Sequence, residues 1–286
     1  MTAHFAKYEA LGNDYIVIDP TRSAVPINTE TVALLCDRHR GIGADGVLYG
    51  PFFELDAVRL RIFNSDGSEC EKSGNGLRMF ARYVREHGHV TTDRFALRTV
   101  AGDAGVQVID LDAGVFTISM GTFTFDSTQI PATGPARRLL DERLDVGGEA
   151  LQISCVNVGN PHCVILGGEV SRERACRLGP VLSRHPMFPN GINVQLAAVR
   201  DRANVDAEVW ERGSGYTLAS GSSACAIACV AYARGLVEPS VTVHMPGGRL
   251  SVAITPSREI LLTGQASAVA EGTLAPGLQR RLAALA

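Results

Sequence analysis

Two serine–glycine turns, each followed by an apolar run, are the segments of this sequence whose residue types suggest chemistry. They are SGNG at residues 73–76 and SGSS at residues 220–223. The first turn of a helix has unpaired N–H groups and a partial positive charge, so it favours an anion such as a carboxylate or phosphate. Serine is also a common helix N-cap, so either turn alone fits a plain cap. As a pair, however, Ser73 and Ser220 suggest that both helix starts contribute to one ligand-binding site, with one serine on each side of the ligand.

The two turns belong to a longer internal duplication. Ser220 follows Ser73 by 147 residues, and Asn160 follows Asn13 by the same 147 residues. The matching segments are LGNDYIVI (11–18) with VGNPHCVI (158–165), LRIFNSDGSECEKSGNG (60–76) with AEVWERGSGYTLASGSS (207–223), and GVFTISMG (114–121) with REILLTGQ (258–265). The first two pairs share the spacing of 147 and the third follows after a small length change, and such ordered matches indicate repeated units. We therefore predict two homologous lobes, 1–122 and 123–286, joined within the Thr-, Pro- and Gly-rich stretch 122–138, with the last strand free to return to the first lobe.

The elements that must position these turns are mostly strands. Short β-rich runs such as YIVID, VRLRIF, HCVIL and AEVWE lie between Gly and Asn turns. A surface helix is predicted to open at Asn28 or Thr29, and one helix is predicted after each serine. The helix after Ser220 is apolar nearly all round, which is typical of a helix buried on every side. The fold class is therefore α+β: two pseudo-symmetric lobes, each a mostly antiparallel sheet wrapped around a central helix, with the site in the cleft between them.

The charge, hydropathy and cysteine content of the sequence indicate which classes of binding partner are not expected and which class is expected. The 27 basic and 30 acidic residues are interspersed, so no basic stripe suggests nucleic acid and no polybasic run suggests a membrane surface. No apolar window is long enough for a membrane span, and a cytoplasmic enzyme acting on a small molecule is expected. Seven scattered cysteines predict neither a disulfide scaffold nor a metal site. Cys225 and Cys229 lie four apart among Ala, Ile and Val, which favours buried small hydrophobes over ligands.

Along nearly its whole length the sequence resembles the diaminopimelate epimerase family of pyridoxal-independent amino-acid racemases. The resemblance is carried, in order, by LGNDY, CDRHRGIGADGV, RIFNSDGSE, SGNG, VGNPHCV, WERGSGYTLASG and MPGGRL. It implies epimerisation at the α-carbon of an amino acid, most simply LL- to meso-diaminopimelate, without any cofactor or metal. In the family, one cysteine removes the α-proton and a second cysteine on the opposite face returns a proton. A homodimer is also in keeping with the family.

Ser73 and Ser220 occupy the positions of the two family cysteines. The resemblance assigns substrate contacts to Asn13, Asn64, Asn160, Asn193, Glu211 and Arg212, and carboxylate-holding amides to Gly74, Asn75, Gly221 and Ser222. It assigns Glu211 and His162 to the catalytic group, with His162 tuning protonation. The residue types agree, because Arg can fork to a carboxylate and Asn both donates and accepts. The alternative is that Asn13 and Asn160 are turn residues and that Glu211 and Arg212 form an exposed strand end.

Serine changes the expected chemistry at both positions. A thiol with a pKa of about 8.5 can form a thiolate near neutral pH, whereas a serine hydroxyl is a base only if another group takes its proton. Three interpretations stay open from the sequence. The chain is an inactive Cys-to-Ser form, a paralogue acting on another amino acid or as a one-base isomerase of the phenazine-biosynthesis type, or a non-catalytic amino-acid-binding protein. Ser223, at a family glycine position, and Tyr216 favour a natural paralogue.

Overall fold

The structure is a computed structural model that describes residues 3–286 and divides them into two compact units. Unit 1 comprises Met1–Ile118 and Gly264–Ala286, and unit 2 comprises Ser119–Thr263. The chain passes from unit 1 to unit 2 within strand β8 (Val115–Thr122) and returns within strand β17 (Glu259–Gln265). The first passage lies a few residues before the boundary at 122/123 expected from the sequence.

Unit 1 holds strands from both ends of the chain. Its elements are β1 (His4–Ala10), β2 (Asn13–Ile18), α1 (Thr29–Cys36), β3 (Gly46–Phe53), β4 (Val58–Asn64), β5 (Glu69–Cys70), α2 (Gly74–Glu86), β6 (Arg94–Thr99), β7 (Gly102–Asp110), β18 (Ser267–Thr273) and α5 (Pro276–Ala283). Strand β18 belongs here because it pairs antiparallel with β1 along most of its length. The segment after β17 therefore lies in unit 1; the sequence alone assigns residues 123–286 to the second lobe but leaves the last strand free to return to the first.

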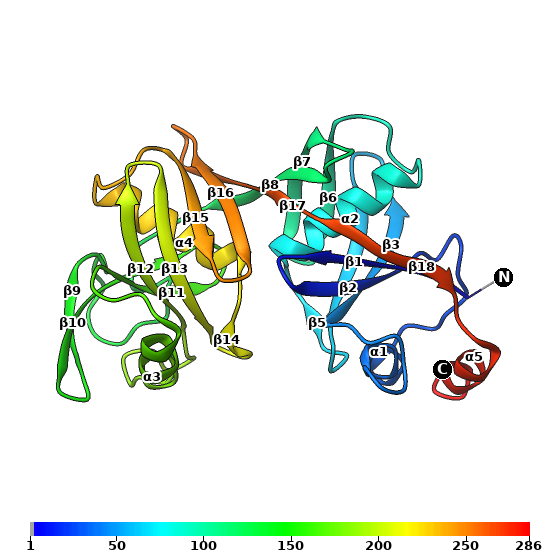
Figure 1. Cartoon of the computed structure of the whole chain (residues 1–286), viewed down its shortest axis with the longest axis horizontal. Helices are drawn as coiled ribbons and strands as arrows, with labels where there is room; N and C mark the ends of the chain where they lie inside the picture. The colour runs from blue at the N-terminus through cyan, green and yellow to red at the C-terminus, as the bar shows by residue number, and fades with distance from the viewer. Residues whose placement is uncertain (1–2) are drawn as a thin grey trace. The chain divides into compact units, whose positions relative to one another are not determined.

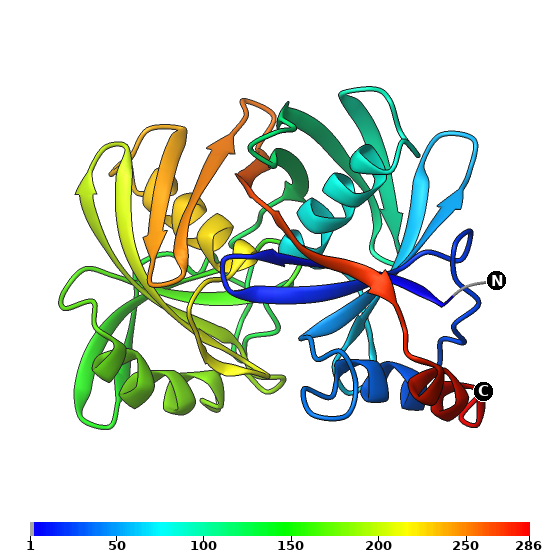
Figure 2. The ribbon, with the colours of Figure 1, turned by 45° about the vertical axis from the view of Figure 1, so that its right-hand side comes forward.

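Unit 2 repeats this arrangement. Its elements are β9 (Glu142–Val146), β10 (Glu149–Asn157), β11 (Pro161–Leu166), α3 (Arg172–Ser183), β12 (Asn193–Asp201), β13 (Asn204–Glu211), β14 (Gly215–Thr217), α4 (Gly221–Ala233), β15 (Ser240–Met245) and β16 (Gly248–Ile254). Helix α4 begins 147 residues after α2 begins and ends 147 residues after α2 ends. In each unit the strands curve around one of these two helices (Figures 1 and 2).

The strand pairings of the two units also agree in register. Parallel β2 and β3 place Tyr15 opposite Gly46, and parallel β11 and β12 place His162 opposite Asn193, which are the same positions 147 residues later. The remaining pairs are mostly antiparallel, including β3 with β4 and β12 with β13. The predicted α+β class, with a mostly antiparallel sheet around a central helix in each lobe, is confirmed.

Burial explains why α2 and α4 are central. Leu77, Met79 and Phe80 of α2 have no exposed surface, and neither have Cys225 and Cys229 of α4. The two cysteines therefore pack as small apolar side chains, as the sequence suggested. Hydrophobic burial on all sides fixes each helix axis, and with it the position of the helix start where the serine lies.

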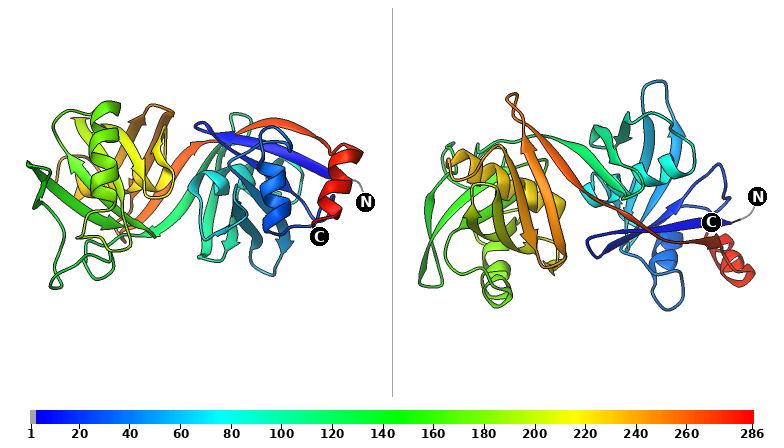
Figure 3. Two further views of the ribbon diagram at one scale, coloured as in Figure 1. Left: turned by 90° about the horizontal axis from the view of Figure 1, so that it is seen from below. Right: turned by 45° about the horizontal axis from the view of Figure 1, so that its top comes forward.

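Helix α1 lies apart from these core helices. It begins after Asn28, at the start predicted for this segment, and Asn28 and Thr31 form a capping box there. Its neighbour is α5, which runs beside it in the turned views (Figure 3). Asn28, which caps α1, donates to the Leu285 carbonyl after α5, and Arg281 of α5 donates to the Arg40 carbonyl after α1. Within residues 3–286 no helix combines the length and apolarity that crossing a bilayer would require.

Candidate active site

Each candidate half-site is built at the start of a core helix. Ser73 is the N-cap of α2, and its Oγ accepts a hydrogen bond from the Gly76 N–H at 3.1 Å. Ser220 is the N-cap of α4, and its Oγ accepts from the Ser223 N–H at 3.5 Å. Both serines have extended backbone conformations, which is the usual geometry of a cap. The cap uses a lone pair of each oxygen, so each hydroxyl proton is left for another acceptor.

The unit 1 half-site is held by a chain of amide and guanidinium contacts. Asn75 donates from Nδ2 to Asn13 Oδ1 at 3.3 Å, and Asn13 in turn donates to Asp45 Oδ2 at 2.8 Å. The fully buried Arg78 donates to Asn75 Oδ1 at 2.6 Å and to the Gly74 carbonyl at 3.2 Å. These bonds fix the turn Gly74–Asn75, whose backbone N–H groups open the helix.

Asn64 lies at the end of β4, opposite Gly46 of β3. It is exposed and donates from Nδ2 to Ser68 Oγ at 2.9 Å, within the turn that follows the strand. The backbone pairing places Asn64 on the same sheet as Asn13, because β3 also pairs with β2. Asn64 therefore sits in unit 1 as a polar side chain facing solvent.

Matching glycines place the two asparagines of the duplicated turn. Gly12 and Gly159 have φ angles of 82° and 107°, a region that L side chains rarely adopt. Each turn delivers an asparagine to the next strand: Asn13 begins β2, and Asn160 directly precedes β11. Asn13 is thus the first residue of its strand and Asn160 the last residue of its turn, and each bonds to another predicted site residue, Asn13 to Asn75 and Asn160 to His162.

In unit 2 a buried polar chain runs from Asn160 to the start of α4. His162 Nε2 lies 2.8 Å from Asn160 Oδ1, and His162 Nδ1 lies 2.9 Å from Gln195 Nε2. Gln195 Nε2 also donates to Ser223 Oγ at 2.9 Å. With Gln195 donating from Nε2 to the ring, Nδ1 is the acceptor and Nε2 carries the proton that it donates to Asn160.

The neutral form of His162 is also favoured by its surroundings. Its side chain has no exposed surface, and burial lowers its pKa to about 3; the bond from Gln195 acts in the opposite direction, and nearby Arg212 lowers it further. His162 is therefore uncharged near neutral pH, and its contacts are those of a side chain that holds Asn160 in place.

Asn193 and Arg212 form a second group in unit 2. Asn193 donates from Nδ2 to the Pro161 carbonyl at 3.0 Å and accepts from the Arg212 N–H at 3.0 Å. The exposed Arg212 side chain donates from Nη1 to the Asn190 carbonyl at 3.1 Å. Most of the guanidinium donors remain available to a carboxylate ligand.

Glu211 lies next to Arg212, at the end of β13. Burial raises the pKa of its carboxyl, and an interaction with the Ser220 hydroxyl acts in the opposite direction by favouring the ionised form. The Ser220 Oγ also lies 3.5 Å from the Ser222 Oγ. The start of α4 thus combines backbone donors from Gly221 and Ser222, two hydroxyls and one carboxyl.

The predicted site residues are divided between the two units. Unit 1 holds Asn13, Asn64, Ser73, Gly74 and Asn75, and unit 2 holds Asn160, His162, Asn193, Glu211, Arg212, Ser220, Gly221 and Ser222. Three supporting residues were missed: Asp45, Arg78 and Gln195. Arg78 could have been found as a charged residue between Leu77 and Met79 on the predicted core helix, four positions after Gly74. Gln195 could have been found as a polar residue inside the apolar strand run that follows Asn193.

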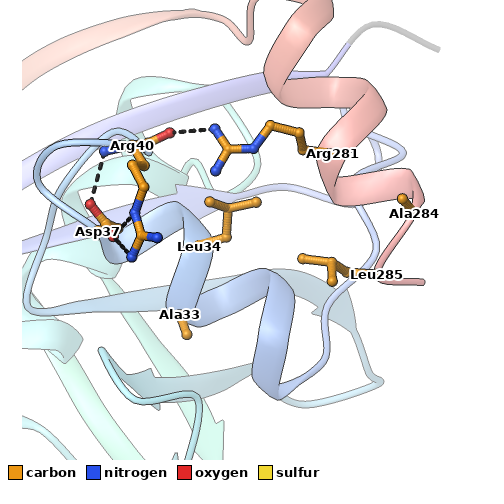
Figure 4. A pocket seen from close by; sticks show the side chains of 7 residues that line it. All are labelled: Ala33, Leu34, Asp37, Arg40, Arg281, Ala284 and Leu285. Carbon is orange, nitrogen blue, oxygen red and sulfur yellow. Dashed lines mark hydrogen bonds and ion pairs between the residues drawn. The ribbon is translucent and has the colours of Figure 1, made fainter.

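A hollow on the surface of unit 1 lies elsewhere, between α1 and α5 (Figure 4). It is lined by Ala33, Leu34, Asp37, Arg40, Arg281, Ala284 and Leu285. Its polar groups bond to one another, since Arg281 donates to the Arg40 carbonyl and Arg40 pairs with Asp37. None of the predicted site residues lines this hollow. Within residues 3–286, no three His, Cys, Asp or Glu side chains are grouped to hold a metal ion.

The sequence profile described as diaminopimelate epimerase matches residues 5–125 and 154–269 of this chain. The chain belongs to the diaminopimelate epimerase family. It is 42% identical over 271 residues to diaminopimelate epimerase 2 of Nostoc sp., covering 94% of this chain and 95% of that protein. It is 38% identical to the diaminopimelate epimerase of Moorella thermoacetica, covering 94% and 98% of the two chains. The predicted family, and with it the predicted class of isomerase, is confirmed.

Solved structures at lower identity share the fold of this diaminopimelate epimerase family member. A probable proline racemase from Agrobacterium radiobacter superposes with a TM-score of 0.68 at 15% identity, covering 97% of this chain and 96% of the other. A phenazine biosynthesis protein of the PhzF family from Bacillus anthracis superposes with a TM-score of 0.65 at 17% identity, covering 96% and 99%. The duplicated two-unit fold is thus shared by proteins with different names.

Proposed function

We propose that this chain binds an amino acid by its α-carboxylate at the starts of α2 and α4, and that it catalyses cofactor-independent epimerisation at the α-carbon. Diaminopimelate is the first candidate substrate, because the curated relatives described above carry that name. The observation that carries the proposal is the duplicated helix start. Ser73 and Ser220 cap their helices in the same way, 147 residues apart, in two units of equal strand register.

The proposed roles follow from the contacts. The N–H groups of Gly74, Asn75, Gly221 and Ser222 would bind the α-carboxylate and stabilise the negative charge that builds up on it when the α-proton leaves. Asn13, Asn64, Asn160, Asn193 and Arg212 would bind the rest of the substrate. His162 would act as a positioning residue for Asn160. Both half-sites would serve the same substrate molecule, as the two-lobed organisation inferred from the sequence requires.

Serine at both proton-transfer positions makes activity the central question. The test incubates the protein with LL- and meso-diaminopimelate and a panel of L-amino acids in deuterated water, and follows α-deuterium by mass spectrometry. Incorporation with at least one amino acid is expected. If no amino acid is labelled while calorimetry still detects binding, the protein is a binding protein and the enzyme proposal is wrong.

The double variant Ser73→Cys with Ser220→Cys separates the remaining interpretations. A gain of diaminopimelate epimerase activity would support a site built for that substrate, because thiols restore groups that ionise near neutral pH. A paralogue for another amino acid should gain nothing with diaminopimelate. We also propose a cytoplasmic homodimer; light scattering on the purified protein tests the dimer, and fractionation of the source cells tests the location.

A further inference from the structure

Asn13 and Asn160 are related by the duplication, but their side chains are held by opposite atoms. Asn13 is held through its amide nitrogen, which donates to Asp45 Oδ2 at 2.8 Å. Asn160 is held through its oxygen, which lies 2.8 Å from His162 Nε2. The residue that follows Asp45 by 147 positions is the fully buried Ile192, so unit 2 has no carboxylate at this place. Asp45 is therefore a feature of one half-site only.

The groups that contact the Asp45 carboxylate are all hydrogen-bond donors. Its Oδ2 accepts from Asn13 Nδ2 and from the Asp14 N–H at 3.1 Å, and its Oδ1 accepts from Arg38 Nη2 at 2.9 Å. An ionised carboxylate only accepts, so the nitrogen of the Asn13 side chain, and not its oxygen, must face Asp45. The orientation of the Asn13 amide thus follows from the chemistry of its partner.

A guanidinium at the other end of the same chain of contacts requires the same orientation. Asn75 Oδ1 accepts from Arg78 at 2.6 Å, and a guanidinium only donates. The nitrogen of Asn75 must then face Asn13, and it donates to Asn13 Oδ1 at 3.3 Å. Each of the two amide nitrogens spends one N–H in this chain, and within residues 3–286 no contact uses the second N–H of either. These two N–H groups are the ones that the unit 1 half-site can offer to a ligand.

Alternating charges hold Asp45 in place. Arg38 bonds to both Asp45 and Asp14, and Lys7 Nζ lies 2.8 Å from Asp14 Oδ2. Lys7 also donates to the carbonyl of Gly43, two residues before Asp45, at 2.6 Å. Burial raises the pKa of the Asp14 carboxyl, but the bonds from Arg38 and Lys7 outweigh burial and keep this pKa below its usual value. The segment before β3 therefore presents a fixed acceptor to Asn13.

We propose that Asp45 is a positioning residue for ligand binding: by accepting one N–H of Asn13, it directs the other N–H to a hydrogen-bond acceptor on the ligand. In diaminopimelate the acceptors at neutral pH are the carboxylate oxygens, because an ammonium group only donates. Asn13 thus contacts a carboxylate of the ligand and not an ammonium group. This inference rests on the proposed function, since it requires an amino acid bound at the unit 1 half-site.

The main experiment is a double-variant cycle between Asp45 and Asn13. Calorimetry measures the binding of meso-diaminopimelate, and of any amino acid of the panel that binds, to the wild type, Asp45→Ala, Asn13→Ala and the double variant. Each single variant should bind about tenfold more weakly, the usual scale for loss of one oriented hydrogen bond. If Asp45 acts through Asn13, adding Asp45→Ala to Asn13→Ala should cost less than about twofold. Asp103→Ala, which removes an exposed carboxylate paired with Arg98, is the matched control and should bind like the wild type.

Asp45→Asn is the conservative variant. A carboxamide at this position keeps one oxygen that can accept from Asn13, and its nitrogen can turn towards Arg38. The Arg38 side chain is 56% exposed, so it can move into water and avoid the new donor. Asp45→Asn should therefore weaken binding less than about threefold, whereas a role that depends on the negative charge alone would make it as weak as Asp45→Ala.

The side-chain amide of Asn13 gives a readout that a purely structural role of Asp45 would not produce. Its two N–H signals, identified by their loss in Asn13→Ala, are followed in a proton–nitrogen correlation spectrum of the labelled protein. In the free wild type one signal should lie downfield because that N–H donates to a carboxylate, and the other should move downfield when meso-diaminopimelate binds. In Asp45→Ala the first downfield signal should be absent, while the remaining signals report whether the fold is retained.

Several results would overturn the inference. They are binding as tight as that of the wild type by Asp45→Ala or Asn13→Ala, an equal loss from Asp45→Ala with and without Asn13, binding by Asp45→Asn as weak as by Asp45→Ala, or an Asn13 signal that does not move when the ligand binds. If Asp45→Ala does not fold, the Asn13 signals of the wild type and the affinity of Asp45→Asn decide. In each of these cases the wild type still binds an amino acid, so the proposed function stands. Absence of binding by the wild type contradicts the proposed function itself, and the inference with it.

Discussion

The stability of unit 2 should fall as the pH drops from 7.5 to 5.0, because His162 is buried in its neutral form. In the unfolded chain its pKa is 6.5, and in the folded chain burial lowers it to about 3. Between these values the unfolded state binds a proton that the folded state does not bind, so the free energy of unfolding decreases as the pH falls. The contribution is intact above pH 6.5 and is lost progressively towards pH 3.

The loss in free energy of unfolding depends on how far the pH lies below the pKa of His162 in the unfolded chain. Each pH unit between the two pKa values costs about 1.4 kcal/mol, and pH 5 lies roughly 1.5 units below 6.5, so the loss is about 2 kcal/mol. His162 has no exposed surface, so screening by solvent does not reduce this figure. The perturbation that isolates it is His162→Gln, which removes the titrating ring and keeps a polar side chain.

The assay is urea unfolding followed by the fluorescence of Trp210, the one tryptophan of the sequence. Trp210 lies on β13 and packs against the core of unit 2, so it reports on the unit that contains His162. The wild type should lose about 2 kcal/mol more than His162→Gln between pH 7.5 and 5.0. His39→Gln, at an exposed position, is the control and should follow the wild type.

Comparing differences between variants removes the contribution of the carboxyl groups, which titrate alike in all three proteins. An equal loss of stability in wild type and His162→Gln would refute the assignment of a buried neutral histidine. A wild type that loses less stability than His162→Gln between pH 7.5 and 5.0 would contradict the sign of the argument, because it would require a folded-state pKa of His162 above 6.5.

Three further changes test the packing around the half-sites. Gly179→Ala places a methyl group on the Trp210 ring, so unit 2 should lose about 1–3 kcal/mol in the same urea titration. Arg78→Met removes the guanidinium that holds Asn75, and calorimetry should detect amino-acid binding weakened about tenfold while unfolding followed by Trp210 is unchanged. Ser223→Ala removes the acceptor of a buried amide donor, and unit 2 should lose about 1–2 kcal/mol in urea.

The duplication was the part of the fold that sequence could predict. A repeat at one spacing aligns whole elements, so Asn13 with Asn160 and Ser73 with Ser220 were enough to predict matching helix starts and matching strands. Helix α3 was missed because Gly179 and Pro180 interrupt its pattern, and both residue types disfavour helix interiors. In the structure Gly179 lets α3 pack directly on Trp210, a tertiary reason that local propensity does not contain.

Strand partners far apart in sequence were harder to predict. The apolar pattern of β18 is compatible with either unit, and only its pairing with β1 places it in unit 1. The polar residues that hold the site residues in place were hard to predict for the same reason, because their partners also come from distant segments. Gln195 looks like an ordinary strand residue until β11 and α4 bring His162 and Ser223 to its amide. Such residues acquire a role from neighbours supplied by distant segments.

The two serines illustrate this limit most directly. Ser73 and Ser220 have the same residue type, the same following glycine and the same cap geometry, so motif reasoning treats them alike. Their neighbours differ, since matching strand ends place an amide in one unit and a carboxyl in the other. A hydroxyl transfers protons only as well as its partner allows. The surroundings of Ser73 and Ser220 therefore differ in a way that neither motif predicts.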